Sequence, residues 1–201
     1  MSTLVFPAPD RGTAFLMARV PSEKPKGVRY ERGLLSGDEE AQLLTHVANL
    51  CFDPIVMHGQ QARRTARHFG LDYDYERREP MPGEPLPPWL AIVRDRAALF
   101  AQVEPEHLVQ ALVQKYPPGA TIGWHSDAPG FGTVVGISLG SACRLRFQRG
   151  RDSARRTWEL VLEPGSGYVL GGEARSSWQH SVPPVKELRY SITFRTIRRP
   201  G

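Results

Sequence analysis

The stretch HLVQALVQKYPPGATIGWHSD (residues 107–127) decides the fold, because two strand-like runs flank the turn sequence PPGA. Short β-branched or aromatic runs bounded by Pro and Gly are typical of strands. Six further runs of this kind follow, at residues 133–140, 143–150, 157–163, 167–172, 179–182 and 188–197. Eight short strands fit a double-sheet jelly roll, whose mouth can hold a ligand. The expected fold class is therefore mainly β with flanking α-helices.

Two helices are expected before these strands. Ser36 and Glu39 form a capping box followed by an apolar stripe, which predicts a helix over residues 37–50. Residues 88–103 have helical spacing and begin with Pro, so a second helix is predicted there. The Arg- and Pro-rich residues 53–88 predict an extended excursion or hairpin over the body.

The domain organisation is simple. Residues 1–27, rich in Pro, Gly and charge, predict an irregular N-terminal arm. The remaining residues, 28–201, predict one domain, because 201 residues with 40% hydrophobic content are enough for one good core. We expect this domain to be a monomer.

The composition excludes membrane-spanning and secreted disulfide-rich classes. No apolar run is long enough to span a bilayer, and residues 1–20 contain Pro, Asp and Arg where a signal peptide would be apolar. Cys51 and Cys143 show no CxxC spacing and are expected to be buried thiols in a reducing compartment. We therefore expect a soluble, cytoplasmic protein that makes no membrane contact.

The charge balance favours an acidic partner. The net charge is +5, with 22 arginines against 4 lysines. Arginine suits phosphate recognition and stacks on bases, although a high arginine content also arises without functional cause. The basic residues that bracket the aromatic segment HFGLDYDY are Arg63, Arg64, Arg67, Arg77 and Arg78. Those around a predicted hairpin are Arg144, Arg146, Arg149, Arg151, Arg155 and Arg156. Basic residues interleaved with aromatic ones are what a groove for single-stranded or flipped nucleotides requires.

His125 and Asp127 are two candidate metal ligands at the end of a predicted strand, and His180 follows several strands later. A lone H-x-D is weak evidence, because Asp commonly caps its own backbone in a turn such as HSDAPGFG. Two His and one carboxylate on a β scaffold, however, form the facial triad that binds non-haem Fe(II) and leaves positions open for substrate and O₂. Trp124 alternates with His125 and is expected to face away from the metal, into packing.

The last predicted strand presents two arginines on one face. Residues separated by an even number point to the same side of a strand. Its polar face consists of Arg189, Ser191, Thr193 and Arg195, and its apolar face of Tyr190, Ile192 and Phe194. Core packing alone does not explain two arginines on one face, whereas an acidic ligand does.

With these residues in place, the chain resembles the AlkB family of Fe(II)- and 2-oxoglutarate-dependent dioxygenases. The matching segments are KYPPGATIGWHSD (115–127), GISLG (136–140), LEPGSGYVLGGEAR (162–175), His180 and RYSITFR (189–195). The resemblance implies a double-stranded β-helix core preceded by helices, with a nucleotide-recognition lid over residues 57–79. It also implies the use of Fe(II), 2-oxoglutarate and O₂ to remove methyl groups oxidatively from nucleobases.

The resemblance also assigns individual roles. The iron ligands that it implies are His125, Asp127 and His180. The co-substrate residues that it implies are Gln114, Tyr116, Arg189, Ser191, Thr193 and Arg195. Among these, Tyr116 and Arg189 match the residues that hold the distal carboxylate of 2-oxoglutarate, and Arg195 matches the arginine near its metal end and the Asp ligand. Gln114 and Ser191 occupy positions that are Asn in other members.

The chain departs from the family where the base is recognised. Two residues beyond the iron-binding Asp, DNA-repair members often have a second acid that reads the damaged base, whereas this chain has Pro129. The candidate substrate-binding residues are Arg63, Arg64, Tyr73, Tyr75 and Arg149. Because the surface is rich in Arg and no wedge motif is evident, single-stranded DNA or RNA carrying 1-methyladenine or 3-methylcytosine is the expected substrate.

Two alternatives stay open at this point. An AlkB-like enzyme could act on tRNA modification or on protein, which Pro129 and the divergent lid favour. A non-catalytic, cupin-like module with a structural metal is the other alternative, and it does not account for the two arginines on the last strand.

Overall fold

The computed structural model describes residues 23–57, 59–74 and 79–198. The first elements are β1 (Val28–Glu31), α1 (Gly37–Ala48), β2 (Asp53–Met57), β3 (Gln60–Asp74), β4 (Glu79–Pro82) and α2 (Pro88–Ala101). The later elements are β5 (Leu108–Tyr116), β6 (Ile122–His125), β7 (Phe131–Leu139), β8 (Cys143–Arg149), β9 (Arg156–Leu162), β10 (Gly167–Leu170), α3 (Gly172–Ser176), β11 (Gln179–Val182) and β12 (Arg189–Ile197). Most of the predicted N-terminal arm, residues 1–22, lies outside the described residues.

Both predicted helices are confirmed, as are all eight predicted strands from residue 107 onward. The capping box is formed at α1: the Glu39 amide donates to Ser36 Oγ at 3.3 Å, and the Ser36 amide donates to Glu39 Oε2 at 2.8 Å. No helix in the described part of the chain is long and apolar enough to cross a membrane.

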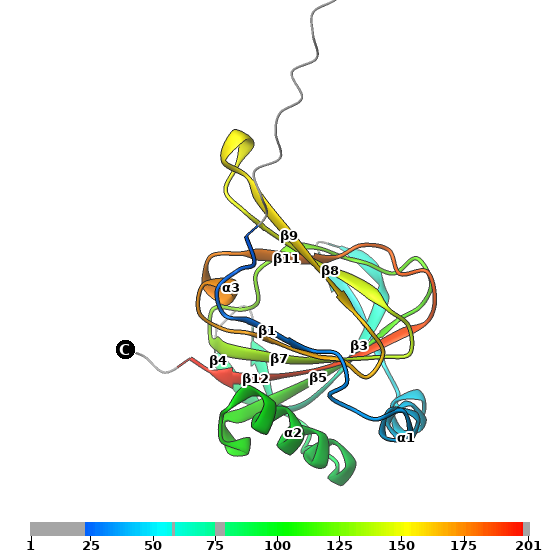
Figure 1. The fold of residues 1–201 in the computed structure, drawn as a ribbon. Coiled ribbons are helices and arrows are strands. Elements are labelled where there is room, and N and C mark those ends of the chain that lie inside the picture. Colours follow the sequence, from blue (N-terminus) through cyan, green and yellow to red (C-terminus); the bar gives the residue numbers. More distant parts are fainter. Residues whose placement is uncertain (1–22, 58, 75–78, 199–201) are drawn as a thin grey trace, which may run out of the picture.

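The strands form two sheets in which every pair is antiparallel. The larger sheet has the order β1-β10-β7-β12-β5-β3-β2, with β4 added to β3, and the smaller has the order β6-β11-β8-β9. Figure 1 shows the smaller sheet on one side of the larger sheet and helices α1 and α2 on the other. This arrangement confirms the expected jelly-roll fold with flanking helices.

Strand β12 separates two apolar cores. Its residues Tyr190, Ile192 and Phe194 pack with α1 and α2 in the first core. The second core lies on the opposite side and includes Tyr116 and Phe147. The predicted apolar face is therefore confirmed, and it directs the polar face of β12 toward the second core. Burial of each large apolar side chain stabilises the fold by about 1.5–3 kcal/mol, so the orientation of β12 is strongly determined.

A close approach inside the barrel requires glycine at position 136. Gly136 on β7 pairs with Tyr168 on β10, and a Cβ atom at Gly136 would lie 2.1 Å from the Tyr168 ring. No side chain can be accommodated at that distance unless the ring moves. Gly136 therefore allows the buried Tyr168 ring to lie across β7 between the two sheets.

Strands β2 and β3 form the predicted hairpin within residues 53–88. The hairpin extends the larger sheet, which corrects the expectation that it lies over the body. Strand β3 pairs with β5 from Thr65 to Gly70. The physical reason is that Ala66 and Phe69 are buried apolar residues within an otherwise basic segment. In the predicted lid, Tyr73 lies on β3 opposite Pro80 of β4, whereas Tyr75, Arg77 and Arg78 lie outside the described residues.

Two further expectations are wrong. Cys51 is exposed, because it lies in the connection just after the C-cap of α1, whereas Cys143 is buried as predicted. Trp124 is 39% exposed instead of packed, because β6 is an edge strand of the smaller sheet. The guanidinium of Arg146 lies over the Trp124 ring at 5.1 Å.

Candidate metal and co-substrate site

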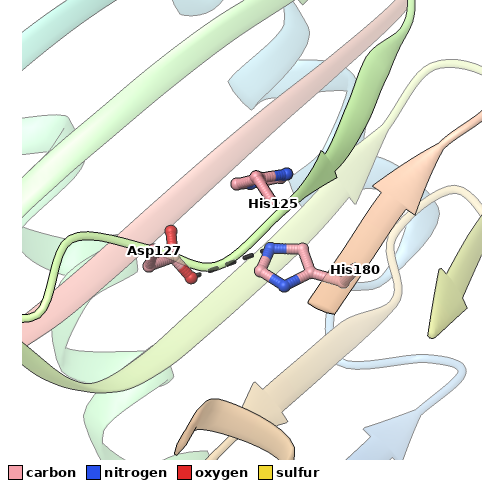
Figure 2. Close-up of side chains that lie close together, drawn as sticks. All are labelled: His125, Asp127 and His180. Carbon is pink, nitrogen blue, oxygen red and sulfur yellow. Dashed lines mark ion pairs between the residues drawn. The ribbon is translucent and has the colours of Figure 1, made fainter. Parts of the chain in front are cut away.

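The three predicted metal ligands come together (Figure 2). His125 ends β6 and pairs directly with His180 on β11, and their ring centroids lie 4.2 Å apart. Asp127 follows two residues after His125, and one ligand atom from each residue lies within 4.8 Å of the others. That separation is of the order of two metal–ligand bonds of about 2.1 Å, so one ion can bridge all three residues.

A hydrogen bond orients His125 for metal binding. Its Nδ1 atom lies 2.9 Å from the backbone carbonyl of Gly123. A carbonyl only accepts, so the proton is on Nδ1 and the lone pair is on Nε2. Such a partner on the second ring nitrogen is the usual support of a metal-binding histidine.

Asp127 divides its two oxygens between an arginine and the centre of the site. Arg195 Nη2 donates to Asp127 Oδ1 at 3.1 Å. Asp127 Oδ2 is buried, makes no hydrogen bond within the described part of the chain, and lies 3.7 Å from His180 Nε2. A buried carboxylate oxygen without a partner is costly. Two imidazoles and this oxygen therefore fit an Fe(II) ion, which would satisfy it.

The burial and charge of the site keep its ligands in the form that binds metal. Burial raises the pKa of Asp127, but Arg195, with His180, Arg175 and His125, outweighs it and holds this pKa at about 2. Burial lowers the pKa of His180 to about 4, against the opposing effect of Asp127. Near neutral pH the site thus contains a carboxylate and a neutral imidazole at these two positions, which are the protonation states that bind metals.

A chain of hydrogen bonds supports Arg195 from behind. Arg195 Nη1 donates to Gln110 Oε1 at 2.8 Å, and Gln110 Nε2 donates to the carbonyl of Leu71 at 2.8 Å. Gln110 was not among the predicted site residues. Its even spacing from Gln114 and Tyr116 on β5 was the available signal, because these positions share one face of the strand.

The second predicted arginine, Arg189, is buried at the other end of the same face, with 2% of its surface exposed. Its Nε donates to Ser138 Oγ at 3.1 Å, and its guanidinium lies over the Tyr116 ring at 5.0 Å. The Tyr116 hydroxyl donates to Gln114 Oε1 at 3.0 Å. No carboxylate among the described residues forms an ion pair with Arg189. A buried cation without an acidic partner favours an acidic ligand.

A comparison with protein families identifies this arrangement. The family described as the 2OG-Fe(II) oxygenase superfamily matches residues 32–195. The chain belongs to this oxygenase superfamily. Its members use Fe(II), 2-oxoglutarate and O₂, and its dioxygenase chemistry disfavours the alternative of a module with a purely structural metal.

Individual relatives place this oxygenase among AlkB-like members. It is 33% identical to the alpha-ketoglutarate-dependent dioxygenase AlkB of Salmonella typhimurium. The alignment spans 154 residues and covers 65% of each chain. It is 26% identical to the alkylated DNA repair protein ALKBH8 homolog of Arabidopsis thaliana. This alignment spans 165 residues and covers 69% of this chain and 47% of that protein. The chain thus spans about half to two thirds of the length of these relatives.

A solved structure supports the fold. The structure of OsALKBH1 matches the oxygenase with a TM-score of 0.66 and 18% identity, over 87% of this chain and 98% of that chain. Because the identity is only 18%, this similarity shows a shared fold, the jelly roll with its flanking helices.

The remaining predicted co-substrate residues lie on the inner face of the oxygenase. Ser191 and Thr193 are buried on β12 between the two arginines.

Arg63 and Arg64, two candidate substrate residues, point to opposite faces of β3. The Arg63 side chain is exposed, whereas Arg64 is only 8% exposed. Arg64 is two residues from Ala66, which pairs with Gln114, so Arg64 lies on the same face as Gln114.

Arg149 lies at the end of β8, the strand that pairs with the His180 strand β11. It follows Phe147, which pairs with His180, by two residues and is on the same face. Its Nη1 donates to Glu173 Oε2 at 3.0 Å, and its guanidinium lies over the Trp178 ring at 5.4 Å. The Trp178 side chain is buried.

The lowered pKa of His180 predicts acid-sensitive folding of the metal-free oxygenase. Between pH 6.5, the usual His pKa, and about pH 4 the unfolded chain binds a proton that the folded chain excludes, so stability falls as the pH falls. We expect this residue to cost about 2 kcal/mol of unfolding free energy between pH 7 and pH 5. Urea unfolding in the presence of a chelator measures it. The variant His180→Gln should show a smaller loss over this range, and an equal loss would contradict the prediction.

Proposed function

We propose that this oxygenase removes methyl groups from alkylated nucleobases in single-stranded DNA or RNA. The observation that carries the proposal is the group of exposed arginines that follows the strand next to His180. Strand β8, which pairs with the His180 strand, leads into a hairpin whose exposed arginines are Arg151, Arg155 and Arg156. The names of the two curated relatives, a dioxygenase AlkB and an alkylated DNA repair protein, agree with this class of substrate.

A cavity at the base of this hairpin supports the same proposal. It has a volume of about 220 Å³. Its lining combines the aromatic residue Trp178 with four basic residues and two acidic ones, which are Lys24, Lys26, Arg149, Arg156, Glu23 and Glu173. Positive charge next to an aromatic side chain suits a nucleic-acid backbone and its bases. Arg63, exposed on β3, supplies a further cation on another strand.

The co-substrate residues have defined tasks in this proposal. Arg189 and Tyr116 hold the distal carboxylate of 2-oxoglutarate, with Ser138 fixing the Nε of the arginine. Arg195 neutralises Asp127 Oδ1 and so directs Oδ2 to the metal. Gln114, Ser191 and Thr193 are buried on the face that carries the two arginines.

The proposed reaction is an oxidative demethylation that consumes 2-oxoglutarate and O₂. When bound, Fe(II) with 2-oxoglutarate and O₂ supplies an oxidation in which one oxygen atom enters succinate, CO₂ is lost, and the other oxygen atom hydroxylates the N-methyl group. The hydroxymethyl base then releases formaldehyde and the unmodified base. The protein would supply His125, Asp127 and His180 as the ligands of Fe(II) and would leave further positions open for co-substrate and O₂.

Single-stranded substrates are favoured on energetic grounds. A methylated base must leave its stack to reach the metal ligands, which costs a few kcal/mol in a duplex and less in a single strand. Electrostatic attraction to the hairpin arginines offsets part of this cost in a way that depends on salt.

Formaldehyde release tests the proposal. We expect iron- and 2-oxoglutarate-dependent release from oligonucleotides that contain 1-methyladenine or 3-methylcytosine, at least about tenfold faster from single strands than from duplexes. Both DNA and RNA oligomers, with unmethylated oligomers as controls, are compared with methylated peptides and methylated tRNA. Pro129 is exposed where an acid would read the base, so the preferred base is an outcome of this assay. Release from peptides alone would refute the nucleic-acid proposal.

A further inference from the structure

The segment GGEAR (171–175) ends with an arginine that contacts the backbone next to Asp127. Arg175 lies on the short helix α3, far in sequence from Asp127. Its Nη2 donates to the backbone carbonyl of Ala128 at 2.6 Å and to that of Phe131 at 2.9 Å. One guanidinium nitrogen thus ties together both ends of the segment that directly follows the metal ligand Asp127.

The segment 128–131 is a closed turn. The Phe131 amide donates to the carbonyl of Ala128 at 3.1 Å, and the Arg198 amide donates to that of Gly130 at 2.8 Å. Arg175 adds its two bonds to these. The backbone on the C-terminal side of Asp127 is therefore held from α3 and from the end of β12.

The helix that presents Arg175 is itself anchored. The Gly171 amide donates to the carbonyl of Gly27 at 3.0 Å, and the Ala174 amide donates to that of Lys26 at 2.9 Å. A Cβ atom at Gly27 would lie 2.0 Å from the Gly171 carbonyl oxygen, so this close approach requires glycine. The fixed helix gives Arg175 a rigid base from which to hold the turn.

Two guanidinium groups therefore control Asp127 in different ways. Arg195 binds the carboxylate itself at Oδ1. Arg175 binds the backbone that follows and adds positive charge near the carboxylate. We propose that Arg175 is a positioning residue that sets the backbone of the metal ligand Asp127. This inference rests on the proposed function, because it requires that Asp127 bind the metal.

Metal affinity tests the inference directly. Arg175→Met removes the charge and both hydrogen bonds, and Arg175→Lys retains the charge without the planar fork. Arg29→Met is the matched control, because Arg29 Nη2 also donates to a backbone carbonyl, that of Ala101 at 2.6 Å, but away from the site. The dissociation constants for Mn(II) and Co(II) and the visible absorption of the Co(II) protein are measured without O₂, with thermal unfolding of the metal-free proteins alongside.

We expect Arg175→Met to weaken metal binding by about 10- to 100-fold and to change the Co(II) spectrum, as the loss of outer supports of metal ligands does. Arg175→Lys should recover part of the affinity, and Arg29→Met should stay within about twofold of the wild type. Wild-type affinity in Arg175→Met, with or without a lower unfolding temperature, would overturn the inference. A wild-type protein that binds neither metal would instead overturn the proposed function.

Discussion

Replacing His125 by Ala is expected to abolish turnover and to leave the fold intact. His125 is one of three protein ligands, and its ring is held at the end of edge strand β6 by the Gly123 carbonyl. Its removal opens no large core cavity, because the side chain is only partly buried. We expect at least about a hundredfold loss of formaldehyde release, which corresponds to about 3 kcal/mol of transition-state stabilisation.

Ser126→Ala is the matched control for this prediction. Ser126 stands between the two ligands, is exposed, and offers no ligand to the His125, Asp127 and His180 cluster. Its variant should retain turnover within about twofold, whereas His125→Ala should lose both turnover and Mn(II) binding, measured by titration. Retained turnover in His125→Ala would refute the ligand assignment.

The metal ligands could be predicted because their positions follow from strand periodicity. His125 and His180 lie on strands that the pattern of residues 107–197 reveals, and the pairing of β6 with β11 brings them together. The alternation of β12 likewise predicts that Arg189 and Arg195 share a face and that Ile192 and Phe194 share the other. Such local rules hold because one face of each strand is buried in an apolar core.

The supports of these residues could not be predicted in the same way. Arg175 acts on carbonyls 44 and 47 residues away in sequence, and a backbone carbonyl has no side-chain signature. Gln110 joins Arg195 to the carbonyl of Leu71, a contact that depends on the pairing of β3 with β5. Glutamine at an inward position is compatible with many partners, so only the assembled sheet shows which one it has.

The exposure of a side chain on an edge strand cannot be predicted from the local sequence, because it depends on which strands pair. Trp124 is a large aromatic residue of the kind usually found in a core. However, β6 has a neighbouring strand on one side only, so the indole stays at the surface, where it contacts Arg146. The basic segment of β3 is compatible with the predicted hairpin, but it has too few apolar residues to predict that it joins the larger sheet. It joins the larger sheet through Ala66 and Phe69, which suffice to bury its central part.

Replacing Arg189 by Met is expected to weaken 2-oxoglutarate binding by about 100-fold or more, because the loss of one partner from a buried charge pair costs about 3–5 kcal/mol. Fluorescence titration of the Mn(II) protein measures the affinity. A 2-oxo acid that lacks the distal carboxylate, such as 2-oxobutyrate, should be affected much less. Arg63→Met, which removes an exposed arginine, is the control and should leave both affinities within about twofold.

The same substitution should act on stability in the opposite direction. In the free protein Arg189 is a buried cation that contacts the Ser138 hydroxyl and the Tyr116 ring, and no acid among the described residues pairs with it. Burial of a charge without an opposite charge is unfavourable, so Arg189→Met should leave the unfolding free energy of the ligand-free protein unchanged or raise it by about 1 kcal/mol. If Arg189 instead served only to stabilise the fold, Arg189→Met would lower the unfolding free energy and preserve the 2-oxoglutarate affinity. Weaker binding together with undiminished stability is therefore the result that identifies Arg189 as a residue kept for an acidic ligand.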